Sequence, residues 1–258
     1  GAAVALEIDI SQVQAILTDL SGERVLAREQ FPTLGESFPQ VYHKVCQALD
    51  KLLAEMPPSP YGLVGIGVAV HGVVDLSGMI RFIPRLGWRN IDLRSLLEER
   101  YHVPVSLDND GNLAALGPEG QGSEALPQSL AVVNVGDSIS TGLITNGEVF
   151  RGFHGFANAI GHHTINLDEP VQCSCGKYGC WEQYCSNGAV IAYANTVLPQ
   201  PISTLEELIT LIRHQNPLAR QVMDRFLTYL AVGLTNIIFI FDCQAIAISS
   251  ELLSALPY

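Results

Sequence analysis

The sequence is poor in basic residues. Its 258 residues include 14 lysines and arginines against 26 aspartates and glutamates, so the formal net charge is −12 at pH 7. Binding to nucleic acid depends on a basic surface that contacts the phosphates. We therefore do not expect these residues to bind DNA or RNA themselves.

Long uninterrupted apolar runs are also scarce. A helix that crosses a bilayer needs about 20 mostly apolar residues, and the best candidate, Ala231–Ile248, is interrupted by Asp242 and Gln244. The chain opens without a signal-like segment, and three of its six cysteines lie close together. This cysteine usage favours a reducing compartment, so we expect a cytoplasmic protein without membrane contact.

The three clustered cysteines lie in one segment, Gly161–Glu182, which reads GHHTINLDEPVQCSCGKYGCWE. A disulfide or a set of buried thiols could use such cysteines, but an odd number of thiols in a dense, glycine-rich stretch favours a metal site. Three thiolates and one imidazole form a closed tetrahedral zinc site, which would be structural. The spacing leaves both His162 and His163 open as the fourth ligand.

Hydrophobic periodicity predicts an α/β protein with two similar halves, residues 1–118 and 119–258, and a ligand cleft between them. Strands are expected at 3–10, 13–19, 24–31, 63–70, 103–107, 130–135, 141–145 and 245–249. Helices are expected at 38–55, 93–100 and 189–198, and helices are expected to begin near residues 112, 203 and 217.

Several motifs resemble the repressor, open-reading-frame and kinase (ROK) family of sugar kinases and sugar-responsive repressors. The cysteine segment is similar to the zinc motif of that family. The stretch Gly65–Asp75 (GIGVAVHGVVD) resembles its strand and turn, and Val105–Gly117 (VSLDNDGNLAALG) resembles its sugar-binding and catalytic loop. The resemblance implies the actin-like ATPase fold, also called ribonuclease-H-like, with an inserted zinc knot at 161–182.

The resemblance also implies roles for particular residues. The aspartate that matches Asp110 is the general base of the family's kinases, which fits the need of a sugar hydroxyl for a carboxylate acceptor. Without the resemblance, the interpretation of Asp110 as a helix N-cap beside Asn112 would be preferred. Residues matching Asn109, His162 and Glu182 contact the sugar. The implied zinc ligands are His162, Cys173, Cys175 and Cys180, which favours His162 over His163.

Three departures from the family's kinases concern the nucleotide. Their D-x-G-G-T loop reads Glu7–Ser11 (EIDIS) here, and their G-T-G-I-G loop reads Gly136–Ser140 (GDSIS). The kinases also have a glycine run after their last strand, and the matching stretch here is Ile248–Glu251 (ISSE). Bare glycine backbone cradles phosphate, whereas an added carboxylate repels it. We therefore expect no ATP binding and no kinase activity, with Asp110 as a vestigial base.

Other departures concern the sugar. Ala159, in the stretch Asn158–His162, replaces a glutamate that contacts sugar in the family, Arg85 stands where asparagine is common, and His71 stands where proline is usual. Arg85 suits an anionic ligand, or it is a solvated surface residue. Sugar binding is therefore expected to be weakened or altered in its preference.

These departures favour the repressor branch of the family. The expected function is the effector-binding and oligomerisation part of a sugar-responsive transcriptional regulator, with structural zinc and a sugar or sugar phosphate effector. It would act as a homodimer or homotetramer and reach DNA through a winged helix-turn-helix ahead of residue 1. We expect segments at both ends to lie outside this chain. A sugar kinase using Asp110 and an interaction module with a vestigial sugar site are the alternatives.

Overall fold

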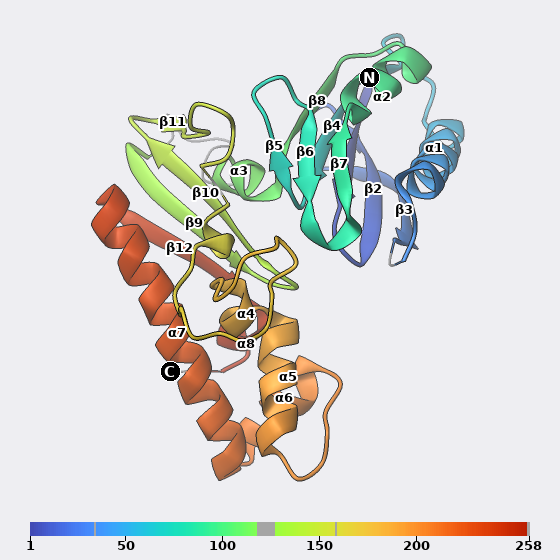
Figure 1. Cartoon of the computed structure of the whole chain (residues 1–258). Coiled ribbons are helices and arrows are strands. Elements are labelled where there is room, and N and C mark those ends of the chain that lie inside the picture. Colours follow the sequence, from blue (N-terminus) through green and yellow to red (C-terminus); the bar gives the residue numbers. More distant parts are fainter. Residues whose placement is uncertain (34, 118–126, 158, 257–258) are drawn as a thin grey trace. The chain divides into compact units, whose positions relative to one another are not determined.

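The computed structural model describes residues 1–33, 35–117, 127–157 and 159–256, and these form two units that are considered separately (Figure 1). Unit 1 contains Gly1–Leu113 and Arg151–Phe156, and unit 2 contains Ala114–Phe150 and Ala157–Tyr258. The boundary expected between residues 118 and 119 lies outside the described residues.

Unit 1 is built on a five-stranded sheet with the order β3-β2-β1-β4-β8. The strands are β1 (Ala2–Ile8), β2 (Gln12–Asp19), β3 (Val25–Pro32), β4 (Leu63–Val70) and β8 (Val105–Asn109). The first three form an antiparallel meander, while β4 pairs parallel with both β1 and β8. The five strands predicted in this half are therefore confirmed, and each of their ends lies within two residues of its predicted position.

Helices α1 (Phe38–Ala54) and α2 (Leu93–Tyr101) share one hydrophobic core with this sheet. The apolar positions of α1 recur at helical spacing, and Val41, Val45, Leu49 and Leu52 are all buried. Asp92 caps α2 by accepting the backbone N–H of Ser95 at 3.1 Å. The apolar side chains that helical periodicity places on one face of α1 are thus the side chains that the core buries.

A small antiparallel sheet, formed by the residues between β4 and α2 in the sequence, was not predicted. It contains β5 (Val73–Val74), β6 (Ile80–Ile83) and β7 (Trp88–Ile91), in the order β5-β6-β7. These strands are too short to show alternation in the sequence. The continuous apolar run Leu63–Val70 predicts a strand buried on both faces. That prediction is wrong, because only Ile66, Val68 and Val70 of β4 are buried while Val64 and Gly67 are exposed.

Unit 2 repeats the pairing pattern of unit 1 on a four-stranded sheet with the order β11-β10-β9-β12. The strands are β9 (Ser129–Val135), β10 (Ile139–Thr145), β11 (Glu148–Val149) and β12 (Ala245–Ser250). Strand β9 pairs antiparallel with β10 and parallel with β12, as β1 does with β2 and β4. The two halves are therefore similar in topology, as the order of predicted elements indicated.

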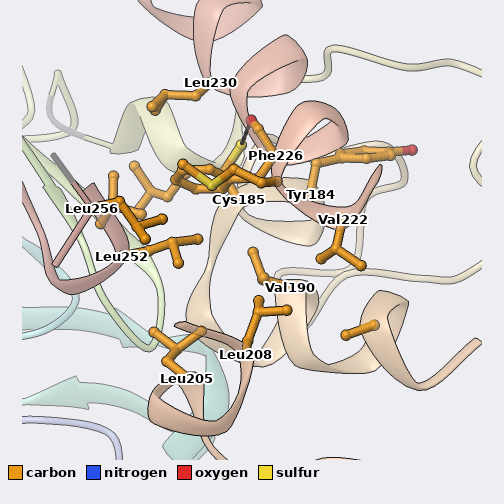
Figure 2. Packing of buried hydrophobic residues seen from close by; sticks show 14 of the residues in the cluster. Tyr184, Cys185, Val190, Leu205, Leu208, Val222, Phe226, Leu230, Leu252 and Leu256 are labelled. Carbon is orange, nitrogen blue, oxygen red and sulfur yellow. Dashed lines mark hydrogen bonds between the residues drawn. The ribbon is translucent and has the colours of Figure 1, made fainter. Parts of the chain in front are cut away.

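The helices of unit 2 pack around one apolar core (Figure 2). They are α4 (Glu182–Cys185), α5 (Asn187–Val197), α6 (Leu205–Arg213), α7 (Pro217–Phe241) and α8 (Glu251–Ser254). Among the described helices, α7 alone is long and apolar enough to span a membrane by length and composition. A core helix also meets that test, and α7 buries Val222, Phe226 and Leu230 in the cluster of Figure 2.

One contact fixes α7 against the cysteine segment. Trp181 is fully buried, and its indole N–H donates to the carbonyl of Tyr229 at 3.0 Å. A Cβ at Gly233 would lie 2.0 Å from the indole ring. The absent side chain of Gly233 is therefore what lets the tryptophan lie directly against the helix.

Replacing Gly233 with alanine should destabilise the protein by about 1–3 kcal/mol, because the buried indole would have to move within a packed core. The matched control is Gly188→Ala in α5, where an added Cβ meets nothing within 4 Å. That change should leave stability unaltered or raise it by up to about 1 kcal/mol. Urea unfolding measures both, and equal stabilities would contradict the packing argument.

Candidate functional site

The candidate ligand site of unit 1 lies where three parallel strands end at the same edge of the sheet. In the pairing register, Ile8 of β1 is opposite Val70 of β4, and Val70 is opposite Asn109 of β8. The residues that follow these positions are therefore neighbours. In open α/β sheets, ligands bind outside the carboxyl ends of the strands.

We call residues Asp108–Asn112 the Asp110 loop. Within it, Asn109 caps α3 (Asp110–Ala115): its Oδ1 accepts the backbone N–H groups of Gly111 (2.9 Å) and Asn112 (3.3 Å). Its Nδ2 donates to the carbonyl of Gly72 at 2.7 Å. The cap suggested as an alternative for Asp110 thus belongs to Asn109, which is 9% exposed and has one amide hydrogen beyond these bonds.

The two carboxylate oxygens of Asp110 have different surroundings. Oδ2 lies 3.0 Å from Nδ1 of His71, the residue directly after β4. Oδ1 is buried, and no hydrogen-bond donor among the described residues reaches it. The sequence marked His71 only as a departure from the family pattern. Its contact with Asp110 could have been suspected from its place at the end of a neighbouring parallel strand.

The surroundings of Asp110 are acidic. Partial burial, together with the negative charges of Asp9 and Asp110, raises the pKa of Glu7 above its ordinary value, and His71 opposes this shift. The backbone N–H of Ile10 donates to Oδ1 of Asp9 at 2.6 Å, and the N–H of Asp9 donates to the carbonyl of Gln12. Two backbone donors of the first phosphate-like loop are therefore already engaged within the chain.

Four potential metal ligands converge in unit 2. The nearest donor atoms of His162, Cys173, Cys175 and Cys180 all lie within 4.8 Å of one another. The sulfurs of Cys175 and Cys180 are 3.6 Å apart, as are the sulfur of Cys173 and Nδ1 of His162. In a tetrahedral site with zinc–sulfur bonds of about 2.3 Å, neighbouring ligand atoms lie about 3.7 Å apart. The donor set and its spacing therefore fit zinc.

The structure brings His162 to the thiols and directs His163 elsewhere. His163 Nδ1 contacts the carbonyl of Ile160, and its Nε2 lies 3.0 Å from the amide nitrogen of Asn236 on α7. Spacing alone left both histidines open. The fold separates them because consecutive side chains point in different directions.

Backbone geometry holds the cysteines in place. Gly176 and Gly179 have φ values of +92° and +69°, which glycine adopts without strain. A Cβ on Gly179 would lie 1.6 Å from the carbonyl oxygen of Asn166.

Burial raises the pKa of Cys180 to about 11 and also raises that of Cys173. Metal binding would therefore displace protons from these thiols.

Glu182 lies beside the potential metal ligands at the start of α4. Its Oε1 accepts from the Cys173 thiol at 3.2 Å and lies 3.7 Å from Nδ1 of His162. The carboxylate is only 4% exposed. The structure thus brings His162 and Glu182 together in unit 2, and Asn109 and Asp110 together in unit 1.

Two departures in the expected sugar site have clear positions. Arg85 is exposed in a short 3-10 helix, Pro84–Leu86. Ala159 begins another 3-10 helix, Ala159–His162, while Asn158 of the same stretch lies outside the described residues. Neither position supplies a hydrogen-bonding carboxylate or amide side chain.

Comparison with solved structures identifies the fold as the actin-like ATPase fold. A ROK family glucokinase from Streptomyces griseus, solved with glucose and AMPPNP, superposes with a TM-score of 0.84 at 22% identity, covering 99% of this chain and 85% of that one. The ROK family model matches residues 3–258, and this chain belongs to the ROK family.

The relatives include both regulators and enzymes. The xylose repressor of Bacillus subtilis is 33% identical over 258 residues, which is 100% of this chain and 66% of the repressor. A glucokinase of Halalkalibacterium halodurans is 28% identical over 207 residues, covering 75% of this chain and 63% of the enzyme. The chain therefore spans less than two thirds of the length of either relative.

If the four-residue cluster binds zinc, Cys175→Ser should lower the metal content well below one ion per chain. It should also lower the melting temperature by about 5 °C or more, since metal binding contributes directly to folding stability. Elemental analysis and thermal unfolding measure the two effects. Cys243→Ser, outside the cluster, is the control. Equal metal content in both variants would rule out a site that uses Cys175.

Proposed function

We propose that this chain is the effector-binding part of a ROK family transcriptional repressor and that its effector is a neutral sugar. The observation that carries the proposal is the buried Oδ1 of Asp110, which no donor among the described residues reaches. A carboxylate oxygen enclosed in this way costs free energy until a donor satisfies it. A sugar hydroxyl is such a donor.

Charge favours an unphosphorylated sugar over a sugar phosphate. Glu7, Asp9 and Asp110 interact electrostatically at the proposed site, with His71 as the opposing group. A phosphate dianion would meet this acidic surface unfavourably. The xylose repressors among the relatives make D-xylose the first sugar to test.

The regulatory role is supported by the names of the relatives that align with the whole chain, which are xylose repressors. Contact with DNA would come from the part of those proteins that this chain does not span. For the sugar to control DNA binding, it must bind one arrangement of the repressor more tightly than another. A homodimer or homotetramer in the cytoplasm remains part of this proposal.

Loss of ATP binding is also part of the proposal. The engagement of the Ile10 N–H by Asp9 supports it, because the carboxylate takes the place that a phosphate oxygen would need. The second phosphate-like loop carries Asp137 where its kinase counterpart has no acid. Asp110 would then hold a sugar hydroxyl without passing it to a phosphoryl donor.

A metal ion in the cluster would be structural. His162, Cys173, Cys175 and Cys180 would hold zinc, which would cross-link the segment and stabilise the thiolates. Glu182 would be held beside this centre through its contacts with Cys173 and Ser174. Loss of the metal would therefore be expected to alter sugar binding as well as stability.

The second candidate function is a sugar kinase. The intact Asp108-Asn109-Asp110 sequence and the glucokinase relatives favour it. An interaction module that responds to no sugar is the third, favoured by Ala159. The three candidates differ in what they bind, which makes them separable by one screen.

The test is a thermal-shift screen with D-xylose, D-glucose, N-acetyl-D-glucosamine, their phosphates and Mg-ATP. A ligand that binds only the folded protein raises its melting temperature. We expect a shift with a neutral sugar and none with Mg-ATP. A clear Mg-ATP shift with sugar phosphorylation would favour the kinase, and no shift with any sugar would favour the interaction module.

The same screen tests Asp110. Replacing it with asparagine removes a charge-assisted hydrogen bond, so sugar affinity should fall by about tenfold or more. Asp19→Asn is a matched change within unit 1, because Asp19 pairs with Ala2 at the opposite end of β1 from the proposed site, and it should bind as the wild type does. Wild-type affinity in Asp110→Asn would show that the sugar binds elsewhere.

A further inference from the structure

The second segment of unit 1, Arg151–Phe156, is inserted between parts of unit 2 in the sequence. We call it the strap. It follows β11, and its ends continue into Phe150 and Ala157 of unit 2. Six residues from the second half of the chain thus pack as part of unit 1.

The strap lies against β5 and the turn after it. Gly155 has a φ of +81°, and a Cβ there would lie 2.3 Å from the carbonyl oxygen of Val74 and 2.8 Å from Cα of Asp75. Such an approach is open only to glycine. The backbone of the strap is therefore held in direct contact with Val74 and Asp75 in the other segment of unit 1.

The turn under the strap is itself well ordered by hydrogen bonds. Oδ1 of Asp75 accepts from the backbone N–H and hydroxyl of Ser77 and from the N–H of Met79, and Oδ2 accepts from Arg81 at 2.7 Å. Burial alone would raise the pKa of Asp75, but these bonds outweigh it and lower the pKa to about 2. Asp75 is therefore ionised near neutral pH, and the turn under the strap is cross-linked by its hydrogen bonds.

At the start of the strap, Arg151 reaches the Asp110 loop. Its Nε and Nη2 lie 2.9 Å and 2.8 Å from Oδ2 of Asp108. The other oxygen of Asp108, Oδ1, accepts the backbone N–H of Asn109 and the side-chain amide of Asn112, each at 2.7 Å. One carboxylate, 13% exposed, therefore joins the strap to two residues that flank Asp110.

We propose that Arg151 is a positioning residue of the sugar site, acting through Asp108 to hold the Asp110 loop in its ligand-binding geometry. Asp108 can orient Asn109 and Asn112 only while its own carboxylate is fixed. Arg151 fixes it with a charge-assisted hydrogen bond from Nε and a close ion-pair contact from Nη2, both to Oδ2. Asp110 follows Asn109 directly and takes its direction from the same cap. The proposal rests on the proposed function, because it gives Arg151 a role only if the Asp110 loop binds sugar.

The experiment measures D-xylose binding by isothermal titration calorimetry for the wild type, Arg151→Lys and Arg151→Met. Arg151→Met should raise Kd about tenfold, with the melting temperature of the sugar-free protein lowered by less than about 3 °C, because Arg151 is 38% exposed. Arg151→Lys should recover part of the affinity, since it keeps the charge but not the planar fork.

The matched control is Arg100→Met. Arg100 makes a comparable ion pair in the same unit, 2.7 Å from Asp50, and its side chain is 47% exposed. It has no contact with the Asp110 loop among the described interactions. This variant should keep the wild-type Kd, which separates a positioning role from the general loss of a surface ion pair.

A double-mutant cycle tests whether Arg151 acts through Asp108. The effects of Arg151→Met and Asp108→Asn on Kd should be strongly non-additive, because either change breaks the same contact. Additive effects, or a wild-type Kd in Arg151→Met, would overturn the proposal while leaving the sugar site in place. If the wild type binds neither D-xylose, D-glucose nor N-acetyl-D-glucosamine, the proposed function fails and this proposal fails with it.

Discussion

The concentration of carboxylates at one edge of the unit 1 sheet is the constraint on which the proposed site depends. Glu7, Asp9, Asp108 and Asp110 all follow or end parallel strands, so the pairing register brings them to the same edge. Like charges in proximity are unfavourable unless cations or hydrogen-bond donors compensate them. A backbone N–H, His71 and Arg151 supply part of this compensation.

The compensation divides the carboxylates into two kinds. Asp9 accepts a backbone N–H, and Asp108 accepts from Arg151 and two asparagines, so both are committed within the protein. Asp110 is only half committed, because His71 contacts one oxygen while the other is buried without a donor among the described residues. A site that binds a polyhydroxyl ligand needs an acceptor of this second kind.

The fold of unit 2 brings four potential metal ligands and a buried glutamate together in one short segment. Left-handed glycines shape the segment, and Trp181 and His163 attach it to α7. The close approach of Trp181 to Gly233 means that the metal cluster and the longest helix share one packed interface. Changes in the cluster are therefore expected to disturb the packing of the core of this unit.

The sequence by itself determined most of the framework, because its signals are local. Strand alternation and helical periodicity give the elements, Asn216 and Pro217 mark the start of α7, and the cysteine spacing marks the cluster of potential metal ligands. The family motifs identified the ROK family. The stretch Ser203–Glu206 has the pattern of a capping box, but in the structure the box forms one residue later, between Thr204 and Glu207 at the start of α6.

Only the tertiary structure decided which side chains meet. The contact of His71 with Asp110 joins residues 39 apart in sequence, and that of Arg151 with Asp108 joins residues 43 apart. It likewise brings His162, which the family resemblance favoured, to the three thiols and gives the α3 cap to Asn109. Pairing register and backbone direction fix such contacts, and neither leaves a mark in the local pattern of residues.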